Sequence, residues 1–166
     1  MKDKLLKKIL IAGNDKDKLA AFLYRDQYEK ERLRYQDLQR QLMPGNLTML
    51  AVENPFLLDY GKNPFIQLDV PRNASPKRAL PHFTDTRAVD NFLKSQGIKH
   101  LVVTDPARSQ CLYGSSFWEN EKQENKHKHY HQDWLVGMTE YFAFVKEKMA
   151  DKSVRKVSDR FYIVDF

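Results

Sequence analysis

The chain has 166 residues, of which 42% are hydrophobic and 12% aromatic, and its basic residues exceed its acidic residues by six. This length suits one domain with a sizeable core, and this composition excludes a chain that is disordered throughout. The single cysteine, Cys111, excludes an internal disulfide framework and a zinc site with several cysteines. The positive charge favours anionic partners, although a solvated basic surface is the simpler interpretation.

The N-terminal third is predicted to be mainly helical. Residues 1–14 combine lysines with apolar runs that are too short for a signal peptide, so we expect a flexible or membrane-proximal lead-in. Residues 15–43 predict a long helix that Pro44 and Gly45 end. Mixed charges over residues 25–32 interrupt its apolar stripe, which indicates a solvated helical surface rather than a sustained coiled coil.

Two strands are predicted next, over residues 47–52 and 65–70. The apolar residues 56–60 between them predict a short turn or the start of a helix. Residues 71–83 contain three prolines, and we expect them to form a long ordered loop. None of the glycines that a phosphate-binding loop needs follows the first strand, which argues against a standard dinucleotide or P-loop enzyme.

The clearest unit of the sequence is a helix followed by a glycine and a buried strand. Residues 87–96 place apolar side chains on one helical face, and Asp85 or a neighbouring threonine can cap the helix. Gly97 can adopt the left-handed conformation that ends such a helix. The apolar, β-branched residues 101–103 then predict a strand buried on both faces, which Asp105 ends.

The remainder predicts loops, one more helix and a hairpin. Residues 106–116 are expected to form a loop or a short turn, and the charged, histidine-rich residues 117–130 are expected to be exposed. Residues 132–149 predict a helix with a broad apolar face. Residues 153–157 and 161–166 predict a terminal β-hairpin.

These elements predict an α/β fold. Strands that alternate with helices favour a parallel sheet, and the terminal hairpin would add an antiparallel edge. We therefore expect residues 1–166 to form a single three-layer domain with a small, mostly parallel sheet, a C-terminal antiparallel hairpin and a long N-terminal helix.

Three carboxylates follow or end apolar strands and are candidate binding residues. Glu53, Asp69 and Asp105 are expected to approach one edge of a parallel sheet. Carboxylates at such an edge can bind a metal or perform acid–base chemistry. Asp and Glu also stabilise loops and helix caps at strand ends, and this structural interpretation carries more weight.

Basic residues near the same loops are a second candidate site. Arg72, Lys77, Arg78 and Arg108 could form a phosphate-binding surface. Nucleic acid is disfavoured as a partner, because no sequence signature of a nucleic-acid-binding fold accompanies these residues.

Histidine and cysteine side chains give weaker signals. His127, His129 and His131 alternate along the chain, but flanking lysines oppose a metal dication, and exposed loop histidines are the favoured interpretation. Cys111 could be a nucleophile only if His82 or His100 supplied a base, and a small buried apolar role is favoured. We expect no metal and no cofactor.

Several short motifs occur in a characteristic order along the chain. They are Leu42-Met43-Pro44, Pro55-Phe56-Leu57-Leu58-Asp59-Tyr60, Leu68-Asp69-Val70-Pro71, Ser75-Pro76, Leu80-Pro81-His82-Phe83, residues 92–101 and Arg160-Phe161-Tyr162-Ile163-Val164. From about residue 10 onward, this series resembles the C-terminal soluble region of bacterial multi-pass membrane proteins related to polyprenyl-phosphate-sugar-dependent (GT-C type) glycosyltransferases. Ala79 departs from the pattern, because glycine is expected there.

The resemblance implies an extramembrane domain on the periplasmic face, without the membrane helices whose loops carry the family's catalytic acidic residues. No catalytic residue is therefore transferred to this chain. The implied function is a noncatalytic accessory or binding domain, and its implied partners are the membrane part of its own parent protein or a lipid-linked or anionic substrate.

Two alternatives come from the residues themselves. One is a stand-alone, cytoplasmic small-molecule-binding protein or enzyme that uses the carboxylates at the strand ends. The other is a protein that binds an anionic polymer or lipid through its basic surface.

Overall fold

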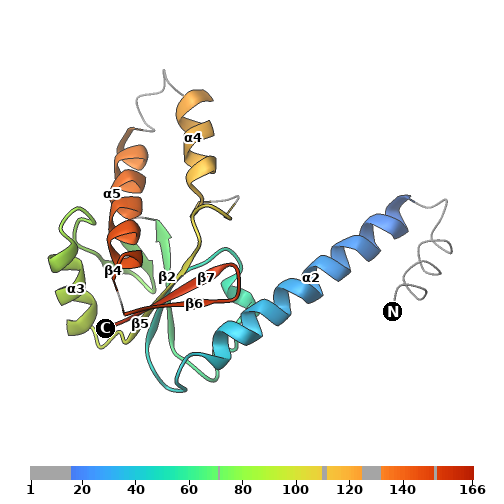
Figure 1. Ribbon diagram of the computed structural model, residues 1–166, viewed down its shortest axis with the longest axis horizontal. Helices are drawn as coiled ribbons and strands as arrows, with labels where there is room; N and C mark the ends of the chain where they lie inside the picture. The colour runs from blue at the N-terminus through green and yellow to red at the C-terminus, as the bar shows by residue number, and fades with distance from the viewer. Residues whose placement is uncertain (1–15, 71, 110–111, 125–131, 152) are drawn as a thin grey trace.

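The computed structural model describes residues 16–70, 72–109, 112–124, 132–151 and 153–166. The described residues form four α-helices, one 3₁₀ helix and one seven-stranded sheet (Figure 1). In chain order the elements are α2 (Lys16–Arg40), β1 (Thr48–Ala51), η1 (Pro55–Leu57), β2 (Phe65–Val70), β3 (Asn73–Ser75), β4 (Arg78–Ala79), α3 (Thr86–Ser95), β5 (His100–Thr104), α4 (Ser115–Glu124), α5 (Gln132–Met149), β6 (Val154–Val157) and β7 (Phe161–Asp165). None of these helices is long and apolar enough to span a membrane.

The sheet is mixed, with the strand order β4-β3-β2-β1-β5-β7-β6. Strand β1 pairs in parallel with β2 and β5, whereas the outer pairings are antiparallel. The prediction of a mostly parallel sheet is therefore wrong outside the three central strands. The predicted antiparallel hairpin at the C-terminus is confirmed by β6 and β7. The antiparallel pairs that were not predicted include β2–β3 and β3–β4, because the short connections between these strands permit only antiparallel neighbours.

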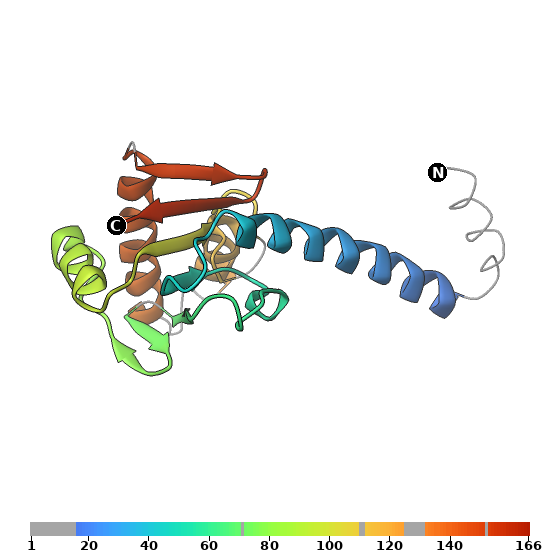
Figure 2. The ribbon, with the colours of Figure 1, turned by 90° about the horizontal axis from the view of Figure 1, so that it is seen from below.

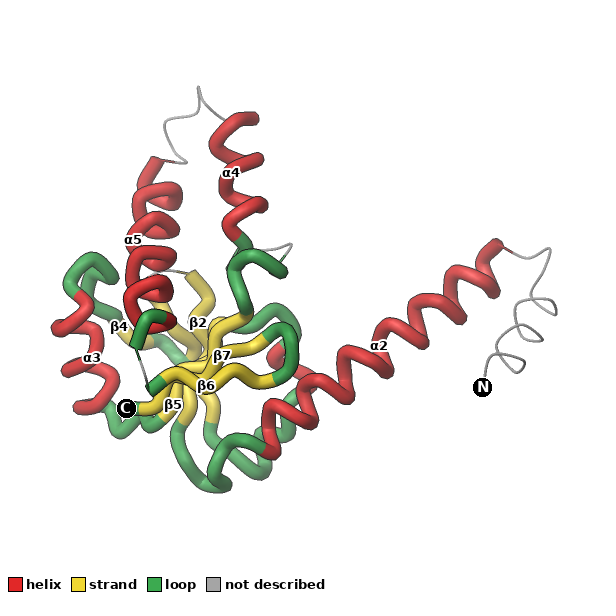
Figure 3. The backbone as a smooth tube through the Cα atoms, viewed as in Figure 1, coloured by secondary structure: helices red, strands yellow, loops and turns green. Residues whose placement is uncertain are grey.

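Helices cover both faces of the sheet, as the tube in Figure 3 and the rotated ribbon in Figure 2 show. Side chains alternate along the strands, so Leu101 and Val103 of β5 face one apolar cluster and Val102 faces the other. Helices α3 and α5 pack on the first cluster, and the C-terminal half of α2 packs on the second through Tyr35 and Leu38.

The predicted helix–glycine–strand unit is confirmed. The carboxylate of Asp85 accepts a hydrogen bond from the backbone N–H of Ala88 and thereby caps α3. Gly97 has a φ of +74°, which is the left-handed conformation that the end of the helix requires. Strand β5 is buried along its whole length between β1 and β7.

One predicted loop contains regular structure, and one segment that was expected to be exposed is part of a helix. Residues 71–83 hold the antiparallel strands β3 and β4, because Pro76 occupies the turn between the strands, where it interrupts no ladder. Residues 117–130 were expected to be exposed, but Trp118 is buried within α4. Helix α4 has only one adjacent pair of aromatic residues, so its sequence lacks the apolar periodicity by which helices are recognised.

Candidate functional site

The candidate carboxylates lie at the end of the sheet where the parallel strands terminate. Glu53 follows β1 and Asp105 follows β5, while Asp69 is exposed near the end of β2. Strands β1, β2 and β5 are parallel, so their carboxyl ends share one edge of the sheet. Strands β2 and β5 lie on opposite sides of β1, so the strand order reverses at β1. Ligands of α/β folds commonly bind at such a topological switch point.

Glu53 is held by an arginine from the turn between β6 and β7. Nη2 of Arg160 donates to one carboxylate oxygen of Glu53, and the hydroxyl of Ser109 donates to the other. Nη1 of the same arginine lies 2.8 Å from both carboxylate oxygens of Glu31 on α2. The side chains of Glu31 and Glu53 are each only 13% exposed, so this network joins α2 to the sheet.

Asp105 organises the loop that follows β5. Its carboxylate accepts a 3.0 Å hydrogen bond from the backbone N–H of Ala107, and its backbone carbonyl accepts one from the N–H of Ser109 at 3.1 Å. Arg108 lies 3.8 Å from the same carboxylate. These contacts fit the structural role that carboxylates commonly have at strand ends.

The arginines of the predicted basic surface have separate partners. Arg72 binds Glu140 of α5, and Arg78 donates to the amide oxygen of Gln96 after α3. Arg108 forms a 3.1 Å ion pair with Asp159. Arg72 and Arg108 are paired with carboxylates and therefore present less free positive charge than the sequence suggests, whereas the partner of Arg78 is a neutral amide. The phosphate-binding role stays a prediction.

Only some of the predicted histidine and cysteine residues lie in the part of the chain that the structure describes. Cys111 and the three alternating histidines at 127, 129 and 131 lie outside the described residues. Nδ1 of His100 lies 2.8 Å from Asp165, and its Nε2 lies 3.2 Å from the amide nitrogen of Asn46. Within the described ranges, no group of three or more histidine, cysteine, aspartate or glutamate side chains could hold a metal.

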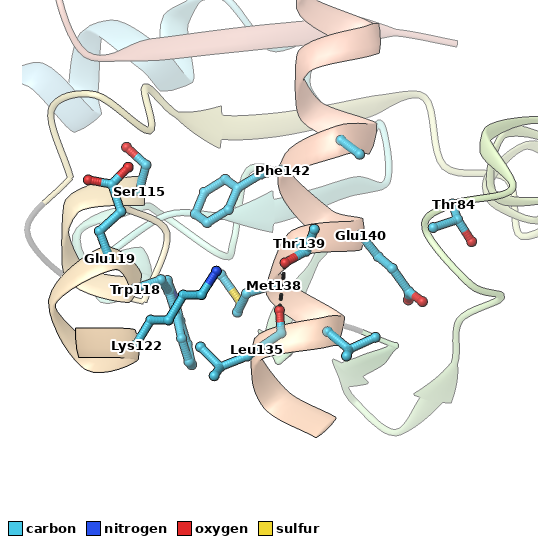
Figure 4. Close-up of a pocket in the computed structure, with 12 residues that line it drawn as sticks. Thr84, Ser115, Trp118, Glu119, Lys122, Leu135, Met138, Thr139, Glu140 and Phe142 are labelled. Carbon is cyan, nitrogen blue, oxygen red and sulfur yellow. Dashed lines mark hydrogen bonds between the residues drawn. The ribbon is translucent and has the colours of Figure 1, made fainter. Parts of the chain in front are cut away.

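A cavity lies between α4 and α5, and we call it the α4–α5 pocket (Figure 4). Its volume is about 610 Å³, within the range of about 300–1,000 Å³ that is usual for small-molecule sites. The residues that line it are Thr84, Ser115, Trp118, Glu119, Lys122, Leu135, Val136, Met138, Thr139, Glu140, Phe142 and Ala143.

Half of the residues that line this pocket are apolar, and apolar atoms supply most of its lining surface. Phe142 points from α5 into the space between the helices, and Trp118 faces it from α4 (Figure 4). The ring of Trp118 is fixed because its Nε1–H donates to the carbonyl of Leu112 at 2.9 Å. Lys122 extends from α4 toward α5 and places a cation beside the apolar wall. The pocket therefore suits an elongated apolar group that carries a polar end.

A buried carboxylate marks the rim of the pocket. Two N–H groups of Arg72 donate to Oε2 of Glu140 at 3.1 and 2.6 Å, and Nδ1 of His82 lies 3.0 Å from Oε1. Burial raises the pKa of Glu140, but the hydrogen bonds and charges of Arg72 and His82 outweigh it, so the pKa is below its ordinary value. This carboxylate is therefore ionised and fixed at neutral pH.

A second hollow lies between α2 and the segment after β1, and we call it the aromatic groove. Its volume is about 370 Å³. It is lined by Tyr24, Gln27, Tyr28, Lys30, Glu31, Arg34, Asn54, Phe56, Leu57 and Arg160. The groove borders the network of Glu31, Arg160 and Glu53, so it opens beside the switch point of the sheet.

The sequence prediction missed both hollows. The α4–α5 pocket needs helix α4, which was expected to be an exposed segment, and the signals that could have found it are Trp118 and Trp134, whose rings lie 6.4 Å apart. The aromatic groove joins residues from opposite ends of the chain. Searches against protein-family models, curated proteins and solved structures find no match for this chain.

Proposed function

We propose that this chain is an accessory binding domain on the extracytoplasmic face of a membrane glycosyltransferase-like protein. We further propose that the α4–α5 pocket receives the apolar part of a lipid-linked substrate. The observation that carries this proposal is the apolar lining of a pocket of about 610 Å³. The order of the sequence motifs supplies the link to the glycosyltransferase-like parent.

The chemistry of the pocket supports an isoprenoid chain as its occupant. Leu135, Val136 and Phe142 offer aliphatic and aromatic contacts, and Met138 adds a side chain that adapts to an irregular shape. Lys122 supplies a positive charge for a phosphate at the end of such a chain. Transfer of an apolar chain from water into this lining supplies the driving force for binding, at about 25 cal/mol per Å² of apolar area.

The contacts of the strand-end carboxylates favour binding over catalysis. Glu53 is engaged by Arg160 and Ser109, and Asp105 organises its own loop. A general base must be able to reach a substrate proton. Carboxylates that already serve as anchors for arginine and backbone groups are better suited to holding the fold together.

The test uses farnesyl phosphate as a short, soluble polyprenyl phosphate. We expect a saturable change in the fluorescence of the tryptophans, because Trp118 lines the pocket. The variant Leu135→Gln should weaken binding by about fivefold to tenfold, which is the loss expected when one apolar contact of about 1 kcal/mol is removed.

The matched control is Leu33→Gln, since Leu33 is 53% exposed on α2 and does not line the pocket. It should leave the affinity unchanged. Equal weakening by both variants, or no saturable response to farnesyl phosphate, would contradict the proposal. Inorganic phosphate should not reproduce the response.

The link to a membrane parent has its own test. The natural reading frame should encode membrane-spanning helices ahead of the residue numbered 1 here. A stop codon directly upstream in the genome would refute an accessory role within a larger membrane protein. The titration with farnesyl phosphate tests the ligand of the pocket independently of this result.

A further inference from the structure

Three exposed aromatic rings surround the aromatic groove, outside the pocket of the proposed function. Tyr24 is 72% exposed, Phe56 is 67% exposed and Tyr28 is 41% exposed. Tyr24 and Tyr28 are one helical turn apart, so both lie on the face of α2 that meets η1. Aromatic rings that gather around one hollow while exposed to water commonly mark a binding site.

The walls of the groove are fixed in position. The backbone N–H of Asn54 donates to the hydroxyl of Tyr35 at 3.0 Å. Gln39 on α2 both accepts from the N–H of Asp59 at 2.8 Å and donates to its carbonyl at 2.7 Å. These bonds attach the segment around η1 to the buried half of α2, so a ligand would meet a preorganised site with a small entropic cost of ordering.

The charges that line the groove are already paired. Arg34 and Arg160 both bind Glu31, and Lys30 lies 2.8 Å from Asp26. The groove therefore offers little uncompensated positive charge to a phosphate or a carboxylate. It does offer several planar polar groups that can donate and accept hydrogen bonds, including the side-chain amides of Gln27 and Asn54.

We infer that the aromatic groove binds a neutral saccharide. A sugar ring presents a C–H face that packs against an aromatic ring, and its hydroxyl groups both donate and accept hydrogen bonds. Tyr28 and Phe56 supply the rings, while amide, carboxylate and guanidinium groups between them supply the hydrogen-bond partners. The groove also opens at the carboxyl end of β1, where α/β folds place their ligands.

The experiment is a screen against an array of neutral oligosaccharides that contain hexose and N-acetylhexosamine units, followed by calorimetric titration with the best ligand. We expect at least one saccharide to bind. The variants Tyr28→Ala and Phe56→Ala should each weaken that binding by about fivefold or more, and Tyr28→Phe should retain it because the ring remains.

The matched control is Tyr60→Ala, because Tyr60 is also an exposed aromatic residue of the β1–β2 connection, at 51%, but does not line the groove. It should leave the affinity unchanged. The inference is overturned if no neutral saccharide binds, if Tyr28→Ala and Phe56→Ala leave binding intact, or if the groove instead takes only phosphorylated sugars or an apolar peptide. These variants lie outside the α4–α5 pocket, so farnesyl phosphate binding should survive either result.

Discussion

Glu140 shows how one carboxylate can join three segments of the chain. It stands on α5 and binds Arg72 from the end of β2 and His82 from the loop before α3. Its side chain is only 10% exposed, and its pKa lies below the ordinary value of 4.5. The ionised form is therefore more stable in the folded chain than in the unfolded chain.

We predict that Glu140→Gln lowers the free energy of unfolding at pH 7 by about 1–2 kcal/mol, because charge-assisted hydrogen bonds become neutral ones. Chemical denaturation followed by circular dichroism measures the change. The control is Glu147→Gln, an exposed position on the same helix, which should shift stability by less than about 0.5 kcal/mol. Equal effects at the two positions would contradict the role given to Glu140.

Acid should remove the stabilisation that the ionised carboxylates of Glu140 and Asp165 contribute to the fold. Hydrogen bonds from Arg155 hold the pKa of Asp165 below its ordinary value of 3.8, burial opposes this shift, and His100 adds to it. A carboxylate with a depressed folded-state pKa contributes its full stability above the unfolded-state pKa and loses it as the pH falls through the folded-state pKa. The melting temperature of the wild type should therefore fall as the pH drops below about 4.5, and less steeply for Glu140→Gln. Equal slopes of melting temperature against pH for the wild type and Glu140→Gln would contradict this prediction.

Gly114 illustrates a constraint of space. A Cβ atom at this residue would lie 2.0 Å from the backbone carbonyl oxygen of Ser109, whereas one at Gly61 would meet only the carboxylate of Asp59 at 3.1 Å. We predict that Gly114→Ala destabilises the fold by about 1–3 kcal/mol through overpacking, and that Gly61→Ala has a smaller effect. Thermal melts of the two variants provide the comparison. A melting temperature of Gly114→Ala equal to that of the wild type would contradict this prediction, because it would show that the backbone segments at Ser109 and Gly114 move apart easily.

Residue roles that depend on near neighbours could be predicted from the sequence, and those that depend on distant ones could not. The cap Asp85 and the helix-ending Gly97 act within a few positions, so their residue types reveal them. The partner of Glu140 lies 68 positions away at Arg72, and no local pattern announces such a pairing.

Helix α2 carries both core side chains and exposed aromatic side chains. Tyr35 and Leu38 are fully buried against the sheet, whereas Tyr24 and Tyr28 are exposed and line the aromatic groove. The N-terminal end of α2 projects away from the sheet (Figure 1). The helix ends at Arg40, three residues before the predicted end and ahead of the breakers Pro44 and Gly45. The burial of Tyr35 and Leu38 was not predictable, since it depends on how far the sheet extends beneath the helix.

The start of α3 gives a test of local structure. Asp85→Ala removes the side-chain acceptor for the N–H of Ala88 and should lower the free energy of unfolding by about 1 kcal/mol. Asp85→Asn keeps an acceptor and should cost much less. Denaturation midpoints of the two variants distinguish them. If the Asn variant were as unstable as the Ala variant, the cap bond would not be the cause.

Elements with weak patterns were missed for physical reasons. Strands β3 and β4 are three and two residues long, so no alternation of side chains can be detected in them. Helix α4 is largely polar, and tertiary contacts of Trp118 hold it rather than an apolar stripe. The α4–α5 pocket depends on this helix, so the sequence could not place the pocket.

Across the whole molecule, two apolar clusters sandwich the central strands. Strands β1, β5 and β7 contribute side chains to both clusters, whereas β3 and β4 lie at one edge of the sheet. We predict that amide hydrogens of β1, β5 and β7 exchange slowest and that those of β3 and β4 exchange much faster. Hydrogen exchange followed by mass spectrometry or NMR measures the exchange rates of both sets of amide hydrogens in one experiment. Protection of β4 equal to that of β5 would contradict this order.

A nuclear magnetic resonance titration with farnesyl phosphate measures whether the α4–α5 pocket is a binding site. The chain has two tryptophans, so its spectrum has two indole N–H signals. Trp118 lines the pocket, and the ring of Trp134 lies 6.4 Å from its ring. We predict saturable shifts of the Trp118 indole and of the side chains of Leu135 and Met138, with the signals of α2 unchanged. Saturable shifts confined to α2 and η1, or none at all, would contradict it.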